Sequence, residues 1–279
     1  MRKGVAMNED IKHILDRWPY ELGKISVRRV LGADHTVKIQ MRLNLGILQM
    51  EARGRPDGQQ PHGRESLLDY YESRHADHLL RRGSDEGFTL GAQACAELRE
   101  EGMQYYHRYL SNFFLEEYAA VVRDTERNLC LFDFLHKFGR HEPDRQSQEA
   151  FRPYVLMMNA RAKAYVALRE EDIDRALAEV NSGLEKIRTF FEEHGQPQLV
   201  SKSNEVQALL ELRDELISRK PQSRLDVLRQ RLAEAIEGEQ YERAARLRDE
   251  IRRLEEGETP RAEGPSNPEN RRAEGPERP

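Results

Sequence analysis

Apolar and polar residues alternate in one early part of the chain, and this pattern predicts β-strands. The alternation is clearest in the middle of residues 25–53. Its apolar positions are Val37, Ile39, Met41 and Leu43, and the polar residues between them are Lys38, Gln40 and Arg42. Because successive side chains of a strand point to opposite faces, this period predicts strands with one buried face. We therefore predict a small antiparallel meander in residues 25–53, a turn at residues 54–58 and a short helix at residues 9–17.

From Glu65 onward the apolar positions recur at steps of three and four residues, which is typical of amphipathic helices. The expected helices are one that begins near Glu65 and ends at residues 83–87, one in residues 89–100, a long stretch in residues 102–138, a pair in residues 149–194 and one in residues 203–218. The long stretch exceeds an average helix, so we expect a break near Leu115 or Asp124. Residues 141–147 are expected to form a loop.

The helix pair expected in residues 149–194 is similar to a tetratricopeptide-type (TPR) hairpin. Its first helix carries the small residues Ala160, Ala162 and Ala164, which allow two helices to approach closely. The pair is longer than the repeat of roughly 34 residues that is usual for such hairpins. A plain helical bundle accounts for the same pattern, and the sequence leaves both alternatives open.

A second helical hairpin is expected in residues 221–256. One apolar seam consists of Leu225, Leu228, Leu232 and Ala235, and the other consists of Tyr241, Ala244, Leu247, Ile251 and Leu254. Gly238 lies between the seams, and so short a connection requires the two helices to be antiparallel. A hairpin of this size is too small to stabilise itself with its own core. Its remaining apolar positions therefore call for a second hairpin, which predicts a docking role.

The second half of this hairpin resembles the UVR motif shared by the excision-repair proteins UvrB and UvrC, Clp-type chaperone subunits and arginine-kinase activators. The resemblance rests on Glu239-x-Tyr241-Glu242-x-Ala244-Ala245-x-Leu247-Arg248-Asp249-x-Ile251-x-x-Leu254, in which Tyr241 replaces the usual phenylalanine. It implies protein–protein docking. The residues that we assign to docking are Leu225, Leu228, Leu232, Tyr241, Ala244, Ala245, Leu247, Arg248, Asp249, Ile251 and Leu254. The sequence has no Walker A motif, so the UvrB-type ATPase is not expected.

Composition supports a helical chain. Hydrophobic residues make up 38% of the 279 residues and charged residues 34%, which favours helices with one buried stripe over a parallel sheet. We predict a mainly α-helical protein with a small N-terminal antiparallel β element (α+β). The expected parts are a β-meander unit in residues 1–64, a helical, TPR-like domain in residues 65–220, the UVR-like hairpin in residues 221–256 and a disordered tail in residues 257–279, which has no apolar residue larger than alanine.

Charge and cysteine content exclude some classes of protein. The net charge is −5, whereas nucleic-acid-binding domains usually carry a basic face. Two cysteines, Cys95 and Cys130, cannot form a four-cysteine zinc site, and we expect both to be buried structural thiols. The N-terminal residues lack the apolar stretch of a signal peptide, and no membrane span is recognisable. A cytoplasmic location is therefore expected.

Two groups of residues are candidates for a chemical site. Glu72, His75 and His78 lie at helical spacing and would present metal ligands on one face, although solvated histidines explain this polar segment as well. Asp57, His62 and Glu65 flank the Pro-Asp-Gly turn, where a catalytic cluster can be imagined, but turn formation and a helix start account for Asp57 and Glu65. We therefore assign no catalytic residue, no metal and no cofactor.

The leading functional hypothesis is a non-enzymatic adaptor that docks another UVR-containing protein, or a second copy of itself, through residues 221–256. The partner would belong to excision repair or to the Clp and arginine-kinase stress proteins. One alternative is a repair-associated factor that contacts nucleic acid directly, for which the aromatic run from Tyr105 to Tyr118 would supply stacking. Helix core is the simpler explanation of that run. A second alternative is an enzyme with a site near residues 57–78.

Overall fold

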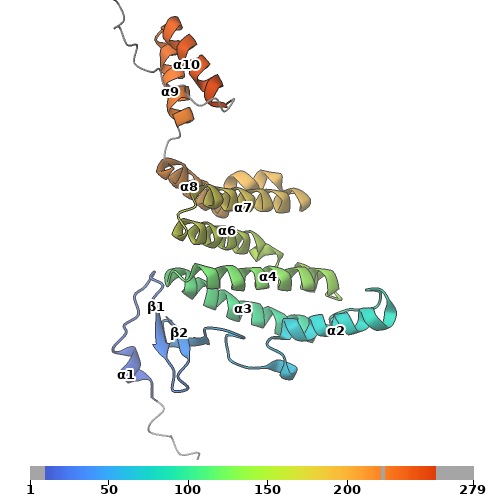
Figure 1. Cartoon of the computed structure of the whole chain (residues 1–279). Helices are drawn as coiled ribbons and strands as arrows, with labels where there is room; N and C mark the ends of the chain where they lie inside the picture. Colours follow the sequence, from blue (N-terminus) through green and yellow to red (C-terminus); the bar gives the residue numbers. More distant parts are fainter. Residues whose placement is uncertain (1–9, 221–223, 256–279) are drawn as a thin grey trace, which may run out of the picture. The chain divides into compact units, whose positions relative to one another are not determined.

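The computed structural model describes residues 10–220 and 224–255 (Figure 1), and the predicted fold class is confirmed. The chain is mainly helical, with a small N-terminal three-stranded sheet and a C-terminal helix pair. It divides into two compact units, one that ends at Arg219 and one that begins at Lys220. The expected tail, residues 257–279, lies outside the described residues. The four-part domain division stays a prediction.

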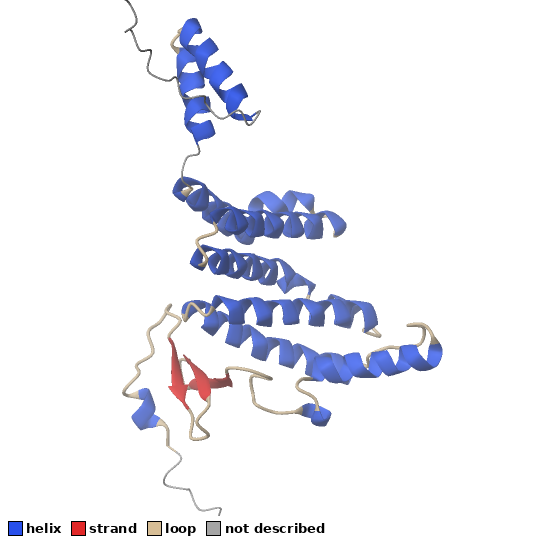
Figure 2. Ribbon diagram, in the orientation of Figure 1, coloured by secondary structure: helices blue, strands red, loops and turns tan. Residues whose placement is uncertain are grey.

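The sheet is an antiparallel meander in the order β1-β2-β3, as predicted (Figure 2). Its strands are β1 (Val27–Leu31), β2 (Val37–Arg42) and β3 (Ile47–Glu51), and a short helix, α1 (Lys12–Leu15), precedes them. The register places Ile39 opposite Met50 and Met41 opposite Leu48. These side chains form the inner face of the sheet and pack with Leu110 of the helical region. The sheet therefore rests on the helices through its alternating apolar residues.

The opposite face of the sheet differs from the expectation of a solvated surface. Lys38 and Arg42 are both only 7% exposed. Lys38 forms ion pairs with Asp34 and Glu51. The Arg42 guanidinium donates to the carbonyl of Trp18 at 2.7 Å and to carbonyls of the β2–β3 turn. These two cations are buried because local acceptors replace water around them.

Seven further helices lie in the first unit between residues 10 and 219, the part of it that the structure describes. They are α2 (Leu67–Arg82), α3 (Ala92–Phe114), α4 (Tyr118–Phe138), α5 (Glu142–Gln146), α6 (Arg152–Arg169), α7 (Ile173–Glu193) and α8 (Asn204–Arg219), with short 3₁₀ turns η1 (Pro61–Gly63), η2 (Glu149–Phe151) and η3 (Pro197–Lys202). None of the helices in the described part of the chain combines the length and the apolar character that a membrane span requires.

Two predicted boundaries are wrong. The boundary expected between residues 100 and 102 is absent, because α3 runs without interruption through Gly102. The break expected near Leu115 is present, whereas Asp124 lies inside α4. Glu116 adopts a positive φ of 59°, and the Glu117 amide donates back to the carbonyl of Asn112, which reverses the chain. The expected loop at residues 141–147 contains α5, which starts with a proline in its first turn.

The helices pack in sequence order, α3 on α4, α4 on α6, α6 on α7 and α7 on α8 (Figure 1). The α6–α7 hairpin confirms the expected helix pair. Ala160, Ala162 and Ala164 are buried, and Gly183 of α7 lies so close to Ala160 that an added Cβ would clash with it. Small residues thus permit the close approach of these two helices. Whether the region is a true tetratricopeptide array stays a prediction.

The described part of the C-terminal unit contains α9 (Arg224–Glu237) and α10 (Tyr241–Glu255), as predicted. The connection is short, and the residue with a positive φ is Glu239, at 53°, rather than Gly238. The Gly238 amide donates to the carbonyl of Glu234, and the Gln240 amide donates to that of Ala235. These bonds satisfy carbonyls that the end of α9 would otherwise leave free, and they start α10 in the antiparallel direction.

Candidate docking surface

The interior of the α9–α10 hairpin contains few apolar residues. Leu228 and Ala235 of α9 are 5% and 1% exposed, and Ala244 and Ile251 of α10 are 9% and 8% exposed. The two alanines lie next to the turn, where their small side chains let the helices approach. The large members, Leu228 and Ile251, pack further from the turn. Four buried positions make a small core, so the hairpin retains little apolar burial of its own.

Other apolar residues of the hairpin are open to solvent. Tyr241 is 71% exposed and Ile236 is 54% exposed. Half-buried apolar residues are Leu225, Val227, Leu232, Leu247 and Leu254. We call these seven residues the open apolar set. Large apolar side chains that remain accessible on a small element are typical of surfaces that bind another protein.

The structure sorts the eleven predicted docking residues into three groups. Leu228, Ala244 and Ile251 are buried between the two helices; Leu225, Leu232, Leu247, Asp249 and Leu254 are half-buried; and Tyr241, Ala245 and Arg248 are exposed. The seam therefore supplies both the internal core and part of the accessible surface. Ile236 was missed because it lies one residue beyond the seam position Ala235. A large branched apolar side chain at the end of a helix is the feature that would have indicated it.

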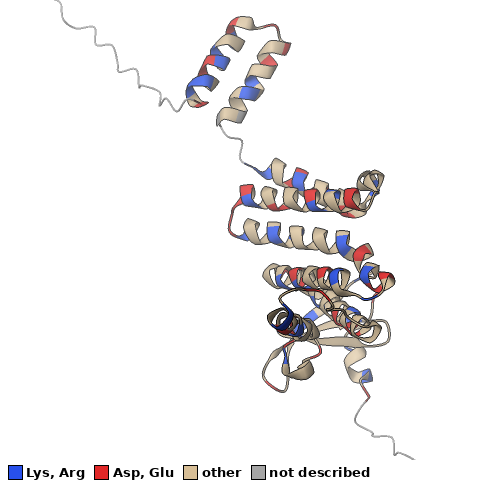
Figure 3. Ribbon diagram, turned by 90° about the vertical axis from the view of Figure 1, so that its right-hand side faces the viewer, with Lys and Arg blue, Asp and Glu red and all other residues tan. Residues whose placement is uncertain are grey.

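Charged residues surround the apolar set. Arg229 pairs with Glu255 at 2.7 Å and joins the two helices, and Arg252 lies 3.6 Å from Asp249 within α10. Figure 3 shows cationic and anionic residues interspersed on both helices of the hairpin. These pairs are largely exposed, so each contributes only about 0–1 kcal/mol to stability. The mixed charge favours recognition of another mixed protein surface over a polyanion.

The geometry defines a small antiparallel helix pair with an incomplete core, which is the form of a protein-docking module. Residues 222–257 match the UvrB/uvrC motif, which confirms the resemblance seen in the sequence. This motif generally mediates protein–protein interaction. Comparisons of the chain with curated proteins and with solved structures found no match.

The structure does not gather Glu72, His75 and His78 into a metal site. The Nε2 of His75 lies 2.6 Å from an Asp85 carboxylate oxygen, and that of His78 lies 2.9 Å from the carbonyl of Glu86. Burial raises the pKa of Glu72. Within residues 10–220 and 224–255, no group of three or more His, Cys, Asp or Glu side chains is arranged to hold a metal ion.

Asp57, His62 and Glu65 are also directed to different partners. Asp57 pairs with Arg55 at 3.2 Å and accepts a hydrogen bond from Gln104. The His62 ring stacks on Tyr70 with centroids 4.0 Å apart. Glu65 instead lines a cavity with residues of α3 and α4. The three residues therefore do not form one catalytic cluster.

The cysteines and the aromatic run have mixed environments. Cys95 is buried, as expected, whereas Cys130 is exposed on α4, so the expectation for Cys130 is wrong.

Tyr105 and Tyr109 are 4% and 1% exposed and belong to the helix core. Burial raises the pKa of both phenols, which keeps them neutral near pH 7. The buried members of the aromatic run are not available for stacking on nucleic acid.

Proposed function

We propose that this protein is a non-enzymatic adaptor that docks another UVR-containing protein through its C-terminal hairpin. The observation that carries the proposal is the open apolar set beside a UVR motif. Ile236 and Tyr241 are more than half exposed although they belong to an element with only four buried apolar positions. An apolar surface on so small an element is covered most simply by a matching helix pair.

A four-helix arrangement meets this requirement. Two antiparallel pairs pack with their apolar seams toward one axis and remove those seams from water. The second pair would come from another UVR protein or from a second copy of this chain. The helices of 14 and 15 residues are long enough for three to four turns of such packing.

The first unit would bind the second partner of the adaptor. It has its own apolar cores and its own surface, so it can bind a different molecule while the hairpin is engaged. We place the protein with excision-repair or Clp and arginine-kinase stress proteins, because the motif occurs in those systems. Its role there would be to bring partners together rather than to catalyse a reaction.

Affinity capture with purified variants tests the proposal. Four proteins serve as separate baits: the full chain, a chain that ends at Arg219, a Tyr241→Ser variant and a Leu80→Ser variant. Leu80 is the matched control, because it is 85% exposed on α2, outside the hairpin. We expect a UVR-containing protein to bind the full chain and the Leu80→Ser variant, and to be lost from the other two.

Light scattering over a range of protein concentrations separates the two sources of the second hairpin. A concentration-dependent dimer that Tyr241→Ser abolishes identifies a second copy of the chain. A monomer at all concentrations assigns the surface to a different UVR protein. Capture of the same set of proteins by the chain ending at Arg219 and by the full chain would refute the docking proposal.

A further inference from the structure

A cavity of about 420 Å³, the one that Glu65 lines, lies in the first unit. Its walls come from the loop after β3, the start of α2, and the facing sides of α3 and α4. Four arginines line it, Arg53, Arg108, Arg123 and Arg127, together with the ring of Tyr105. The size is within the range of small-molecule sites. The four guanidiniums differ in how many of their N–H groups bind acceptors within the protein.

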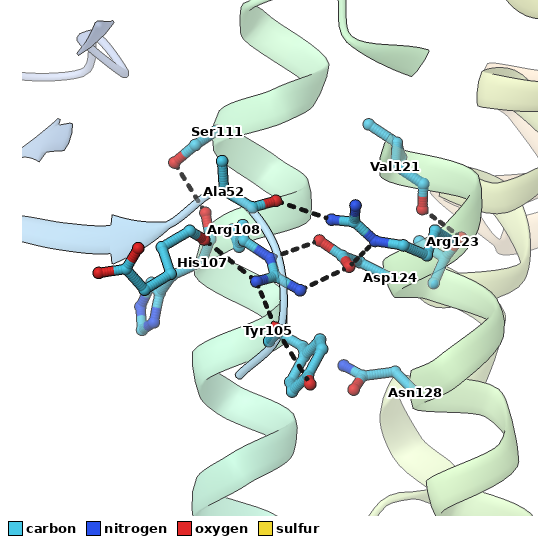
Figure 4. A network of polar contacts seen from close by, with 12 residues as sticks. Ala52, Tyr105, His107, Arg108, Ser111, Val121, Arg123, Asp124 and Asn128 are labelled. Atoms are coloured by element: carbon cyan, nitrogen blue, oxygen red, sulfur yellow. Dashed lines mark hydrogen bonds and ion pairs between the residues drawn. The ribbon is translucent and has the colours of Figure 1, made fainter. Parts of the chain in front are cut away.

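Arg108 is committed to structure. Its Nε and Nη2 each donate to a different oxygen of Asp124 at 2.8 Å, and both side chains are 1% exposed. Its Nη1 donates to the carbonyls of Glu51 and Gly54. Figure 4 shows this guanidinium between Asp124 on α4 and the loop. Four of the five N–H donors of Arg108 are therefore already used within the protein.

The other guanidiniums are only partly used. Arg123 donates its Nε to Asp124 at 2.9 Å and its Nη2 to the carbonyl of Ala52 at 3.2 Å (Figure 4). Arg127 donates its Nη2 to the buried carboxylate of Glu101, but its Nη1 is buried without a partner. Arg53 is exposed and makes no hydrogen bond or ion pair with any residue that the structure describes. Unused donors from two separate segments, the loop after β3 and α4, thus border one cavity.

The network behind the cavity holds the Arg127 guanidinium in place. Glu101 is fully buried, pairs with Arg55 and Arg127, and accepts the backbone amide of Leu67 at 2.7 Å. The Arg127 guanidinium also lies 3.9 Å from the ring centroid of Tyr105. Fixed guanidiniums bind carboxylate and phosphate groups well, because their planar forks are ordered before the ligand arrives.

We propose that this cavity binds a small ligand through one anionic group, a carboxylate or a phosphate, held by Arg53, Arg123 and Arg127. The buried Nη1 of Arg127 would receive the acceptor that it lacks. The Tyr105 ring forms an adjoining wall for the body of the ligand. The site is independent of the docking role of the hairpin.

The carboxylates of Glu65, Asp69 and Asp124 also line the cavity, and they limit the negative charge of a ligand that can bind there. Asp124 is neutralised by Arg108 and Arg123, and Asp69 accepts a hydrogen bond from Ser66. Glu65 also lines the cavity and is exposed. These acids would repel an extended polyanion such as nucleic acid. A single anionic group matches the unused donors and avoids that repulsion.

NMR of the arginine side chains in the full-length protein tests the proposal. Sodium phosphate and sodium acetate are titrated separately at constant ionic strength, with sodium chloride as the blank. We expect saturable shifts of the Nε–H signals of Arg53, Arg123 and Arg127 with phosphate, acetate or both. The anion that binds more tightly identifies the chemical class of the ligand.

Arg53→Gln is the diagnostic variant, because Arg53 is exposed and makes no hydrogen bond or ion pair with any residue that the structure describes. Loss of one charge-assisted hydrogen bond is expected to raise the dissociation constant about tenfold. Arg81→Gln, at the end of α2 and outside this cavity, should leave the dissociation constant unchanged. The proposal is overturned by shifts that equal those in sodium chloride, by equal effects of the two substitutions, or by unchanged binding in Arg53→Gln.

Discussion

Two glycines inside helices differ in the space beside them. At Gly183, an added Cβ would clash with Ala160 and approach Leu209 to 3.2 Å, whereas at Gly102 the nearest side-chain atom is 3.7 Å away. We expect Gly183→Ala to lower the free energy of unfolding by about 1–3 kcal/mol, because overpacking exceeds the gain in helix propensity. Gly102→Ala is expected to raise it by about 0.5–1 kcal/mol. Urea unfolding monitored by circular dichroism measures both, and a stabilised Gly183→Ala would contradict the close packing.

The buried ion pair gives a second test at this scale. Asp124→Ala would leave the Arg108 guanidinium uncompensated in the interior, at a cost of about 3–5 kcal/mol. The control is Glu185→Gln, since Glu185 forms only an exposed pair with Arg188 and should change stability by less than about 0.5 kcal/mol. Chemical denaturation of both variants provides the comparison. Similar small losses would mean that Asp124 and Arg108 are not a desolvated pair.

Individual side chains were the hardest features to predict. Alternation correctly placed Ile39 and Met41 on the buried face of the sheet, because that period follows from strand geometry. It did not predict the burial of Lys38 and Arg42, since their acceptors depend on how loops fold back over the strand. The cavity arginines were missed for the same reason. Their partners are separated by as many as 71 positions, and no local pattern records such a separation.

At the scale of elements, periodicity predicted the helices well and their ends less well. Gly102 suggested a boundary, but burial against Leu131 of α4 offsets the low helix propensity of glycine. The break before α4 depends on a backbone bond from Glu117 to Asn112, which no side-chain pattern specifies. Both hairpins were predicted because short polar connections between amphipathic segments allow few alternatives.

Two tyrosines of the largest apolar cluster, Tyr109 on α3 and Tyr154 on α6, should make the protein sensitive to alkali. Burial raises the pKa of Tyr154 to about 12 and that of Tyr109 further. In the unfolded chain both titrate near pH 10, so their contribution is complete below pH 10 and is lost as the pH rises through the folded pKa values. The free energy of unfolding is measured between pH 9 and pH 12 for the parent and for Tyr154→Phe. It should fall less in the variant, and the difference between the two falls should be about 2–3 kcal/mol at most. An unchanged pH profile would exclude this role of Tyr154.

The hairpin provides a prediction that separates its core from its surface. Leu228→Ala removes one of two large buried side chains and is expected to destabilise the hairpin by about 2–5 kcal/mol. Hydrogen exchange of the full chain should then show lost protection in α9 and α10 only. Tyr241→Ser should leave that protection unchanged, because Tyr241 is mostly exposed. Equal loss of protection in the two variants would contradict the assignment of core and surface.

For the whole molecule, the division at Arg219 predicts that the first unit folds alone. It contains the apolar clusters formed by α2 to α8, so a chain ending at Arg219 should unfold cooperatively with the same midpoint as the corresponding transition of the full chain. Thermal circular dichroism measures both. A truncated chain without a cooperative transition would show that the unit depends on residues beyond Arg219.

The sequence predicted the fold class and the hairpin, but it does not identify a partner. Docking is a property of two surfaces, and only one of them belongs to this chain. The cavity shows the same limit for chemistry, because the ligand contributes the atoms that the arginines lack.

The small interior of the hairpin has a consequence for its persistence in the cell. Under the docking proposal, a partner at a hundredfold excess over its dissociation constant adds about 2.7 kcal/mol to the stability of the folded hairpin. An element with four buried apolar residues would gain a large fraction of its total stability in this way. Chains without a partner would expose α9 and α10 to proteases more often, so the amount of intact protein would follow the supply of its partner.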